Sequence, residues 1–113
     1  MRIEITNRRA ALTDDIHELV RRRAQFAFGR YSDRVNHVLV TISDVNGPRG
    51  GVDQRCQVRV SGRPSWHVVV RDDDADLRVA IGRALNRAGR VVARRIERTR
   101  SAHANAPRRA LGG

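Results

Sequence analysis

Apolar and basic residues recur along residues 77 to 98 with the period of an α-helix. At about 100° per residue, one side carries an apolar stripe made of Leu77, Ile81, Ala84, Leu85, Ala88, Val92 and Ile96. Roughly opposite lies a set that we call the basic row, made of Arg83, Arg87, Arg90, Arg94 and Arg98. The pattern predicts an amphipathic helix that buries its apolar stripe and turns a row of guanidinium groups to solvent.

A shorter helix is predicted to begin after Thr13, whose hydroxyl can cap it. Asp14 and Asp15 then occupy the first turn, where the helix dipole favours negative charge. One face of this helix is apolar and carries Ile16, Val20, Ala24 and Ala27. The helix is expected to end near Gly29.

Four segments alternate apolar and polar residues with the two-residue period of a half-buried strand. The first is RIEIT near the N-terminus, and VNHVLVTIS, QRCQVRV and WHVVV follow the first helix. The residues expected to face the core are Ile3, Ile5, Val38, Val40, Ile42, Cys56, Val58, Val60, Trp66, Val68 and Val70. Glycine, proline and asparagine in DVNGPRGGVD and SGRPS predict two hairpin connections.

The predicted order is β-α-β-β-β-α, an α+β fold. A right-handed crossover makes the first two strands parallel and the hairpins make the others antiparallel, so we expect a four-stranded mixed sheet with two helices packed on one face. One of Asp72, Asp73 and Asp74, most simply Asp74, is expected to cap the second helix. A metal site at these three residues is less favoured, because its ligands would have to converge from several parts of the chain.

Residues 1–100 are expected to form one domain, followed by a disordered basic tail over residues 101–113. The net charge is +11, and all 23 basic residues are arginine. Residues 77–113 hold ten arginines against Glu97 alone, whereas residues 1–76 hold thirteen against eleven acids. Such asymmetry is typical of a surface for nucleic acid or anionic membrane. Arginine binds phosphate through a planar fork of donors and stacks on bases, which favours RNA.

No arrangement typical of an enzyme is found in the sequence. The histidines, His17, His37, His67 and His103, are scattered, and no spacing matches a catalytic triad or a zinc site. We therefore expect no enzymatic activity, cofactor, metal or small-molecule substrate. The single Cys56 agrees with a reducing compartment. No apolar stretch is long enough to span a membrane, so no membrane partner and a cytoplasmic location are expected.

The opening RIEITNRRAALTDDIHELV, the later RYSDRV and the segment DADLRVAIGRALNRAGRVVARR follow one another in a distinctive order. Together they resemble the ribosome hibernation-promoting factor and protein Y family, also called the sigma-54 modulation or S30EA family, over residues 1 to about 98. Members of that family bind the small ribosomal subunit in the channel for messenger and transfer RNA, and block translation when growth stops. The resemblance implies a translation inhibitor of the stress response whose partners are the small subunit and its rRNA.

The resemblance also implies which residues bind RNA. The family's basic positions on the second helix correspond to Arg87, Arg90 and Arg94, which periodicity already places in the basic row. Arg23 corresponds to a usual lysine of the first helix, and Arg34 to the arginine of the family's DRI motif. The expected RNA-binding residues are therefore Arg83, Arg87, Arg90, Arg94, Arg98, Arg23 and Arg34. The chain ends where longer relatives carry a second domain that pairs ribosomes, so we expect a short form and a monomer.

Several alternatives stay open. A generic module for double-stranded or structured RNA also packs helices on one face of a sheet, but it begins with a helix. The terminal RRALGG resembles the diglycine tail of ubiquitin-like modifiers, although flexible glycine tails are commoner. The basic row could be a solvated helix face, yet such a face normally alternates charges of both signs. Gly82 and Gly89 either admit close approach of the first helix or merely loosen the second.

Overall fold

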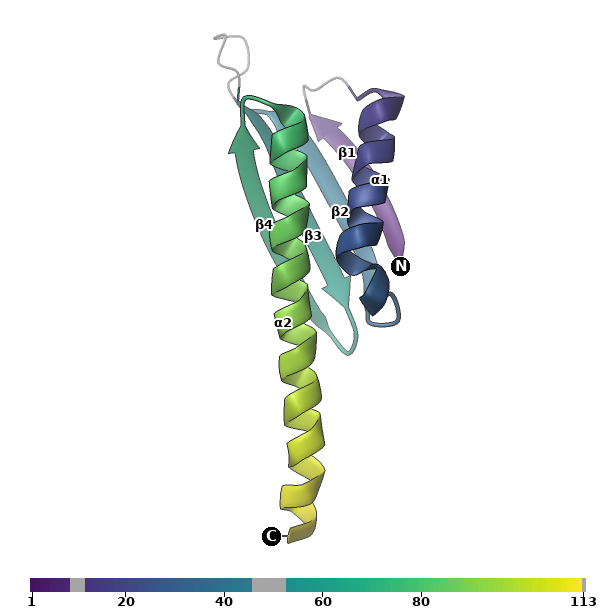
Figure 1. Ribbon diagram of the computed structural model, residues 1–113, viewed down its shortest axis with the longest axis vertical. Coiled ribbons are helices and arrows are strands. Elements are labelled where there is room, and N and C mark those ends of the chain that lie inside the picture. The colour runs from purple at the N-terminus through teal and green to yellow at the C-terminus, as the bar shows by residue number, and fades with distance from the viewer. Residues whose placement is uncertain (9–11, 46–52, 113) are drawn as a thin grey trace.

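The computed structural model describes residues 1–8, 12–45 and 53–112, with the backbone alone beyond residue 98. In chain order the elements are β1 (Arg2–Arg8), α1 (Asp14–Phe28), the short 3-10 turn η1 (Gly29–Tyr31), β2 (Val35–Asp44), β3 (Gln54–Gly62), β4 (Trp66–Asp74) and α2 (Leu77–Gly112) (Figure 1). The predicted order β-α-β-β-β-α is confirmed. The NGPRGG part of the β2–β3 connection lies outside the described residues.

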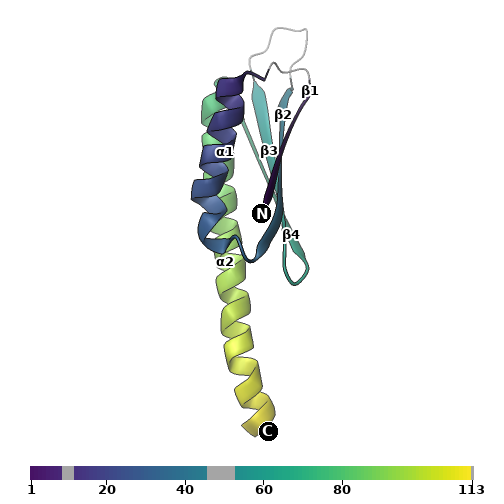
Figure 2. The same ribbon diagram turned by 90° about the vertical axis from the view of Figure 1, so that its right-hand side faces the viewer.

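The strands form one mixed sheet in the order β1-β2-β3-β4. β1 runs parallel to β2, with Ile3 opposite Val38. The two hairpins make β2, β3 and β4 successively antiparallel, so that Val58 lies between Val40 and Val70. Both helices lie on the same face of this sheet, as Figure 2 shows in the edge-on view. The predicted α+β fold with a four-stranded mixed sheet is therefore confirmed.

The core lies between the sheet and the two helices. Its strand residues are those that the two-residue period predicts from β2, β3 and β4, all less than a tenth exposed, whereas Ile3 and Ile5 of the edge strand β1 are only partly buried. α1 and α2 contribute Ile16, Leu19, Val20, Ala24, Phe28, Ala80, Ile81, Ala84, Leu85, Ala88, Val92 and Ile96. Full burial of one large apolar side chain stabilises the fold by about 1.5–3 kcal/mol.

Cys56 belongs to this core and is fully buried. Burial raises the pKa of its thiol to about 12, with a smaller contribution from the nearby negative charge of Asp72. Because the thiolate and not the thiol is the nucleophile, Cys56 is an apolar packing residue at neutral pH. The sequence-based assignment of Cys56 to the core is confirmed.

Each helix begins at a residue whose side chain caps it, and the sequence predicts one of these two caps correctly. Thr13 caps α1, since its Oγ1 accepts a hydrogen bond of 3.3 Å from the Ile16 backbone N–H. The prediction that Asp74 caps α2 is wrong, because Asp76 Oδ1 accepts from the Arg78 N–H at 2.9 Å. Pairing of β4 with β3 continues through Asp74, so the helix starts later than the aspartate cluster suggests.

The C-terminal part of α2 differs from the expected secondary structure. The sequence analysis expects an irregular tail from residue 101, whereas the backbone of α2 is helical to Gly112 and projects beyond the sheet (Figures 1 and 2). Four alanines between residues 101 and 112 favour helix, whereas Pro107 in the same stretch opposes it. The division of the chain into a domain of residues 1–100 and a tail of residues 101–113 stays a prediction.

The β3–β4 turn depends on one glycine. The Trp66 ring lies across Gly62, and its Nε1 donates a hydrogen bond of 2.8 Å to the Arg63 carbonyl oxygen. The Arg63 N–H in turn donates to the Arg34 carbonyl oxygen at 2.9 Å. A Cβ at Gly62 would lie 2.1 Å from the Trp66 ring and 2.4 Å from the Arg34 carbonyl oxygen, so no larger residue fits.

Gly62→Ala is expected to lower the free energy of unfolding by about 1–3 kcal/mol, because the added methyl group forces the Trp66 ring or the backbone to move. Gly29→Ala is the matched control: its Cβ would meet only Gln25 Oε1, at 3.6 Å, and its backbone has a helical φ of −56°. This control should raise stability by about 0.4–1 kcal/mol. Urea denaturation measures both, and equal effects of the two substitutions would contradict the role of Gly62.

Candidate nucleic-acid interface

The basic row lies on the solvent side of α2, as the helical period predicts. All five of its arginines are exposed, and the opposite side of the same helix is buried against β3 and β4. The helix is therefore amphipathic in the predicted sense, with an apolar side in the core and a cationic side in water. The row is not uniform, however, because its members differ in their contacts with β4.

Arg83 and Arg87 are held by aspartates at the end of β4. Arg83 Nη2 lies 2.7 Å from Asp74 Oδ2 and 3.1 Å from Asp72 Oδ1. Arg87 Nη1 lies 3.7 Å from Asp72 Oδ2, and Arg87 also donates a hydrogen bond to the Arg71 carbonyl oxygen. The Asp72 side chain is only 12% exposed between these two guanidinium groups. The two positive charges at this end of the row thus face two carboxylates within the domain.

Arg90 and Arg94 lie about one and two helical turns after Arg87, and their surroundings differ from those of Arg83 and Arg87. Both are exposed, and neither forms an ion pair with an acidic group in the part of the chain whose side chains are described. Their cationic groups are therefore available to an external anion. Arg98 continues the row and is also exposed, while the side chains of the turn that follows it are outside the described set.

The two predicted contributors outside α2 lie in different surroundings. Arg23 is exposed on α1, and its guanidinium carbon lies 3.9 Å from the position of a Cβ on Gly82, so it reaches over the surface of α2. Arg34 is half-buried in the turn before β2. Its backbone N–H donates to Tyr31 and its carbonyl oxygen accepts from Arg63, which ties it to the β3–β4 turn. Arg23 therefore lies against α2, the helix that carries the basic row. The backbone of Arg34 is instead bonded to the β3–β4 turn.

The helices approach most closely where Gly89 of α2 meets Ala27 of α1. A Cβ on Gly89 would lie 3.1 Å from the Ala27 Cβ and 3.3 Å from its carbonyl oxygen. This contact is tighter than ordinary van der Waals packing, so a residue without a side chain allows the observed spacing. Of the two interpretations of Gly89, close approach of the first helix is confirmed. At Gly82 a Cβ would make only ordinary contact with Arg23.

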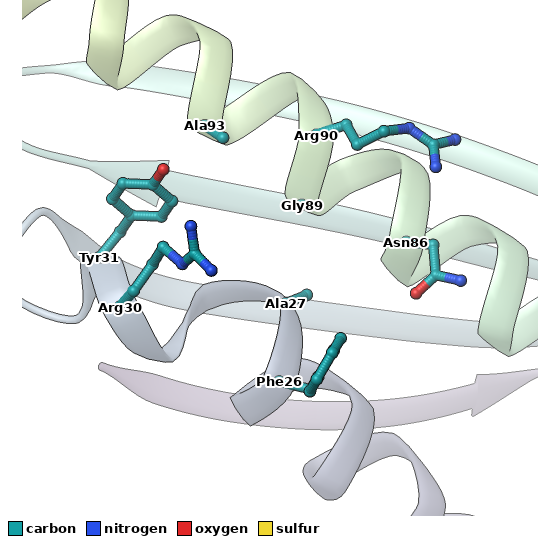
Figure 3. A pocket seen from close by; sticks show the side chains of 8 residues that line it. All are labelled: Phe26, Ala27, Arg30, Tyr31, Asn86, Gly89, Arg90 and Ala93. Carbon is teal, nitrogen blue, oxygen red and sulfur yellow. The ribbon is translucent and has the colours of Figure 1, made fainter.

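A groove of about 430 Å³ lies between the helices around this contact. Figure 3 shows its lining, which comprises Phe26, Ala27, Arg30, Tyr31, Asn86, Gly89, Arg90 and Ala93. Phe26 is 85% exposed, although it is a large apolar residue. The sequence reasoning does not single out Phe26 or Arg30. One signal was available, because Phe26 lies outside the stripe that Ile16, Val20 and Ala24 define.

The far face of the sheet is also polar, but its charges are partly paired. Arg55 makes a two-bond contact with Asp73, with Nε–Oδ1 of 2.9 Å and Nη2–Oδ2 of 3.0 Å. The hydrogen bond from Arg55 lowers the pKa of Asp73 below its ordinary value. Because Asp73 faces away from the helices while Asp72 and Asp74 face Arg83, the three aspartates do not converge. Among the described residues, no three His, Cys, Asp or Glu side chains gather as metal ligands.

No helix in the described ranges combines the length and the apolar composition that crossing a bilayer requires.

Residues 3–100 match the protein family described as sigma 54 modulation protein / S30EA ribosomal protein. No curated protein matches the sequence. Among solved structures, the protein Y N-terminal domain from Thermus thermophilus is similar, with 29% identity, a TM-score of 0.69, and coverage of 83% of this chain and 98% of that chain. A ribosomal subunit interface protein from Coxiella burnetii shares the fold at 9% identity, with a TM-score of 0.71 and coverage of 86% and 99%.

Asp72→Asn is expected to lower the free energy of unfolding by about 0.5–1 kcal/mol, because it removes the carboxylate that faces both Arg83 and Arg87. The effect stays small because solvent screens these half-exposed guanidinium groups. Asp33→Asn, in the exposed turn before β2, is the control and should change stability by less than about 0.5 kcal/mol. Urea denaturation at low and high salt measures the difference, which should shrink as salt rises. An unchanged stability of Asp72→Asn would mean that the ion pairs contribute nothing.

Proposed function

We propose a ribosomal function for this chain, which belongs to the sigma-54 modulation protein / S30EA ribosomal protein family. The chain is a ribosome-associated hibernation factor. Its partner is the small ribosomal subunit and the rRNA of that subunit. It binds in the channel for messenger and transfer RNA through the outer surface of α1 and α2, and so prevents translation by occupying that channel.

The observation that carries this proposal is a pair of exposed cations, Arg90 and Arg94, that form no ion pair with an acidic group among the described side chains. RNA offers a phosphate at every nucleotide, and guanidinium groups bind phosphate oxygens through short, charge-assisted hydrogen bonds. Both residues project from one face of a long helix whose other side is fixed in the core, so their spacing is preset before binding. A rigid cationic face of this kind suits the phosphate backbone of a folded RNA.

The ion pairs at the other end of the row give Arg83 and Arg87 a different role. Their guanidinium groups are oriented by Asp72 and Asp74, so they present a fixed positive edge with less net charge. Arg90, Arg94 and Arg98 are then the primary phosphate contacts, and Arg83, Arg87 and Arg23 support them. No bond is made or broken in this mechanism, because inhibition follows from occupancy alone.

The solved structures support the location but not its details. The neighbour at 29% identity is a protein Y N-terminal domain, and the neighbour that shares only the fold is called a ribosomal subunit interface protein. An interface location would bring the basic surface of the helices close to rRNA. The competing possibility, a module for structured RNA of any kind, predicts no preference for the ribosome and is tested below.

Replacing Arg90 and Arg94 together by glutamate should weaken binding to isolated small subunits by about 100-fold or more, since two charge-assisted contacts of about 1.5–3 kcal/mol each become repulsive. Arg87 is left in place because a glutamate there would face Asp72. The matched control is Arg8→Glu with Arg59→Glu, the same change of net charge on the far face of the sheet. Co-sedimentation with small subunits measures binding, and circular dichroism checks the fold. Equal weakening by both pairs would show that only general attraction operates.

Occupancy of the channel predicts competition with its natural ligands. Unlabelled transfer RNA on small subunits programmed with messenger should displace the labelled protein, and the protein should inhibit translation in a ribosome-dependent extract at a stoichiometry near one per ribosome. A filter-binding assay with an unrelated RNA duplex provides the comparison. If the duplex binds as tightly as the subunit and transfer RNA does not compete, the chain is a general RNA-binding module and the ribosomal assignment is wrong.

A further inference from the structure

We propose that the groove between α1 and α2 is a binding site for a single unpaired nucleotide, with the base stacked on Phe26 and the phosphate held by Arg30. The inference rests on the proposed function in so far as that function makes RNA the ligand. It goes further by naming a site for a base, where the basic row contacts only phosphates.

Phe26 is an aromatic side chain displayed to solvent. It is 85% exposed, whereas the next most exposed large apolar residue of the described chain, Val69, is 48% exposed. A phenylalanine in this position contributes little to the core, and its immediate neighbour Ala27 already makes the contact with α2. Aromatic rings presented in this way stack on nucleobases independently of sequence, because every base has a π-face. The ring of Phe26 is therefore a surface suited to stacking.

The charges around the groove select an anion. Arg30 lines the groove from η1, the turn that follows α1, whereas the Arg90 side chain leaves α2 in the direction away from Arg30 (Figure 3). Both arginines are exposed, and no carboxylate is among the residues that line the groove. A purely apolar ligand would leave two cations near its edge without a counter-charge. A nucleotide supplies both an aromatic ring and a phosphate.

The floor of the groove is open enough for such a ligand. Ala27, Gly89 and Ala93 have little or no side chain, and the volume of about 430 Å³ lies within the range of about 300–1,000 Å³ usual for small-ligand sites. Asn86 projects from α2 on the side of the groove where Phe26 rises from α1 (Figure 3). Its amide carries both donors and an acceptor for the edge of a base. Bases in duplex RNA are stacked and cannot enter, so the ligand is an unpaired nucleotide.

The test compares two variants of the full-length protein in which the aromatic ring of Phe26 is removed or kept. Phe26→Leu keeps an apolar side chain but removes the stacking face, and Phe26→Tyr keeps the face. Val69→Ala, which shortens an exposed apolar residue on the far face of the sheet, is the control. The probes are a single-stranded hexaribonucleotide and the same hexamer with abasic sugars, titrated at constant salt by calorimetry.

Phe26→Leu should bind the base-containing hexamer about tenfold more weakly than the wild type, as expected for the loss of one base–aromatic stack. Phe26→Tyr and Val69→Ala should bind it like the wild type. The wild type should bind the abasic hexamer as weakly as Phe26→Leu binds the normal one. Equal affinity of the wild type for the two hexamers, or an unchanged affinity of Phe26→Leu, would overturn the site, because phosphate alone would then account for binding.

The same variants on isolated small subunits separate this inference from the proposed function. If the wild type binds subunits and Phe26→Leu binds them equally well while Arg90→Glu with Arg94→Glu does not, the nucleotide site is refuted and the ribosomal function stands. If the wild type does not bind subunits but Phe26→Leu still loses affinity for the hexamer, the ribosomal function is refuted and the nucleotide site stands. Chemical probing of rRNA bases should show one unpaired base protected by the wild type and not by Phe26→Leu.

Discussion

The alternation of side chains along the strands sends the large apolar residues of β2, β3 and β4 to one side of the sheet, and both helices must cover that side. Val38, Val58 and Val70 can be buried only if α1 and α2 lie next to each other over the same face. The outward sides of the two helices then lie on the same side of the molecule (Figure 2). The burial that stabilises the domain thus also determines which arginines share a face, so fold and binding surface have a common physical origin.

Within that surface, charge is arranged by contacts with β4. Asp72 is on the helix side of the sheet because it follows the alternation that places Val68 and Val70 there. It therefore meets Arg83 and Arg87 at the start of α2, and among the described side chains the part of the basic row without an ion pair begins at Arg90. Strand register, which has no sequence motif of its own, consequently decides where along α2 an anion is attracted most strongly.

The sequence predicts the parts of the structure that depend on a local period. The strand interior, the Thr13 cap and the two sides of α2 all follow from spacing alone, and the structure confirms them. Features that depend on contacts between distant segments could not be predicted in this way. The pairing of Asp72 with the basic row requires the β3–β4 register, and the cap at Asp76 requires knowing that β4 continues through Asp74.

The contact between Gly89 and Ala27 has a consequence for how such a domain can change. These two small residues set the separation of the helices and form the floor of the groove, so a larger side chain at either position would change the shape of the groove without replacing Phe26, Arg30 or Arg90. The shape of the groove could therefore be altered from its floor while the larger side chains that line it stay the same. The same substitution would loosen packing between the helices. Related proteins are thus expected to vary these two positions together, with an increase in size at one matched by a decrease at the other.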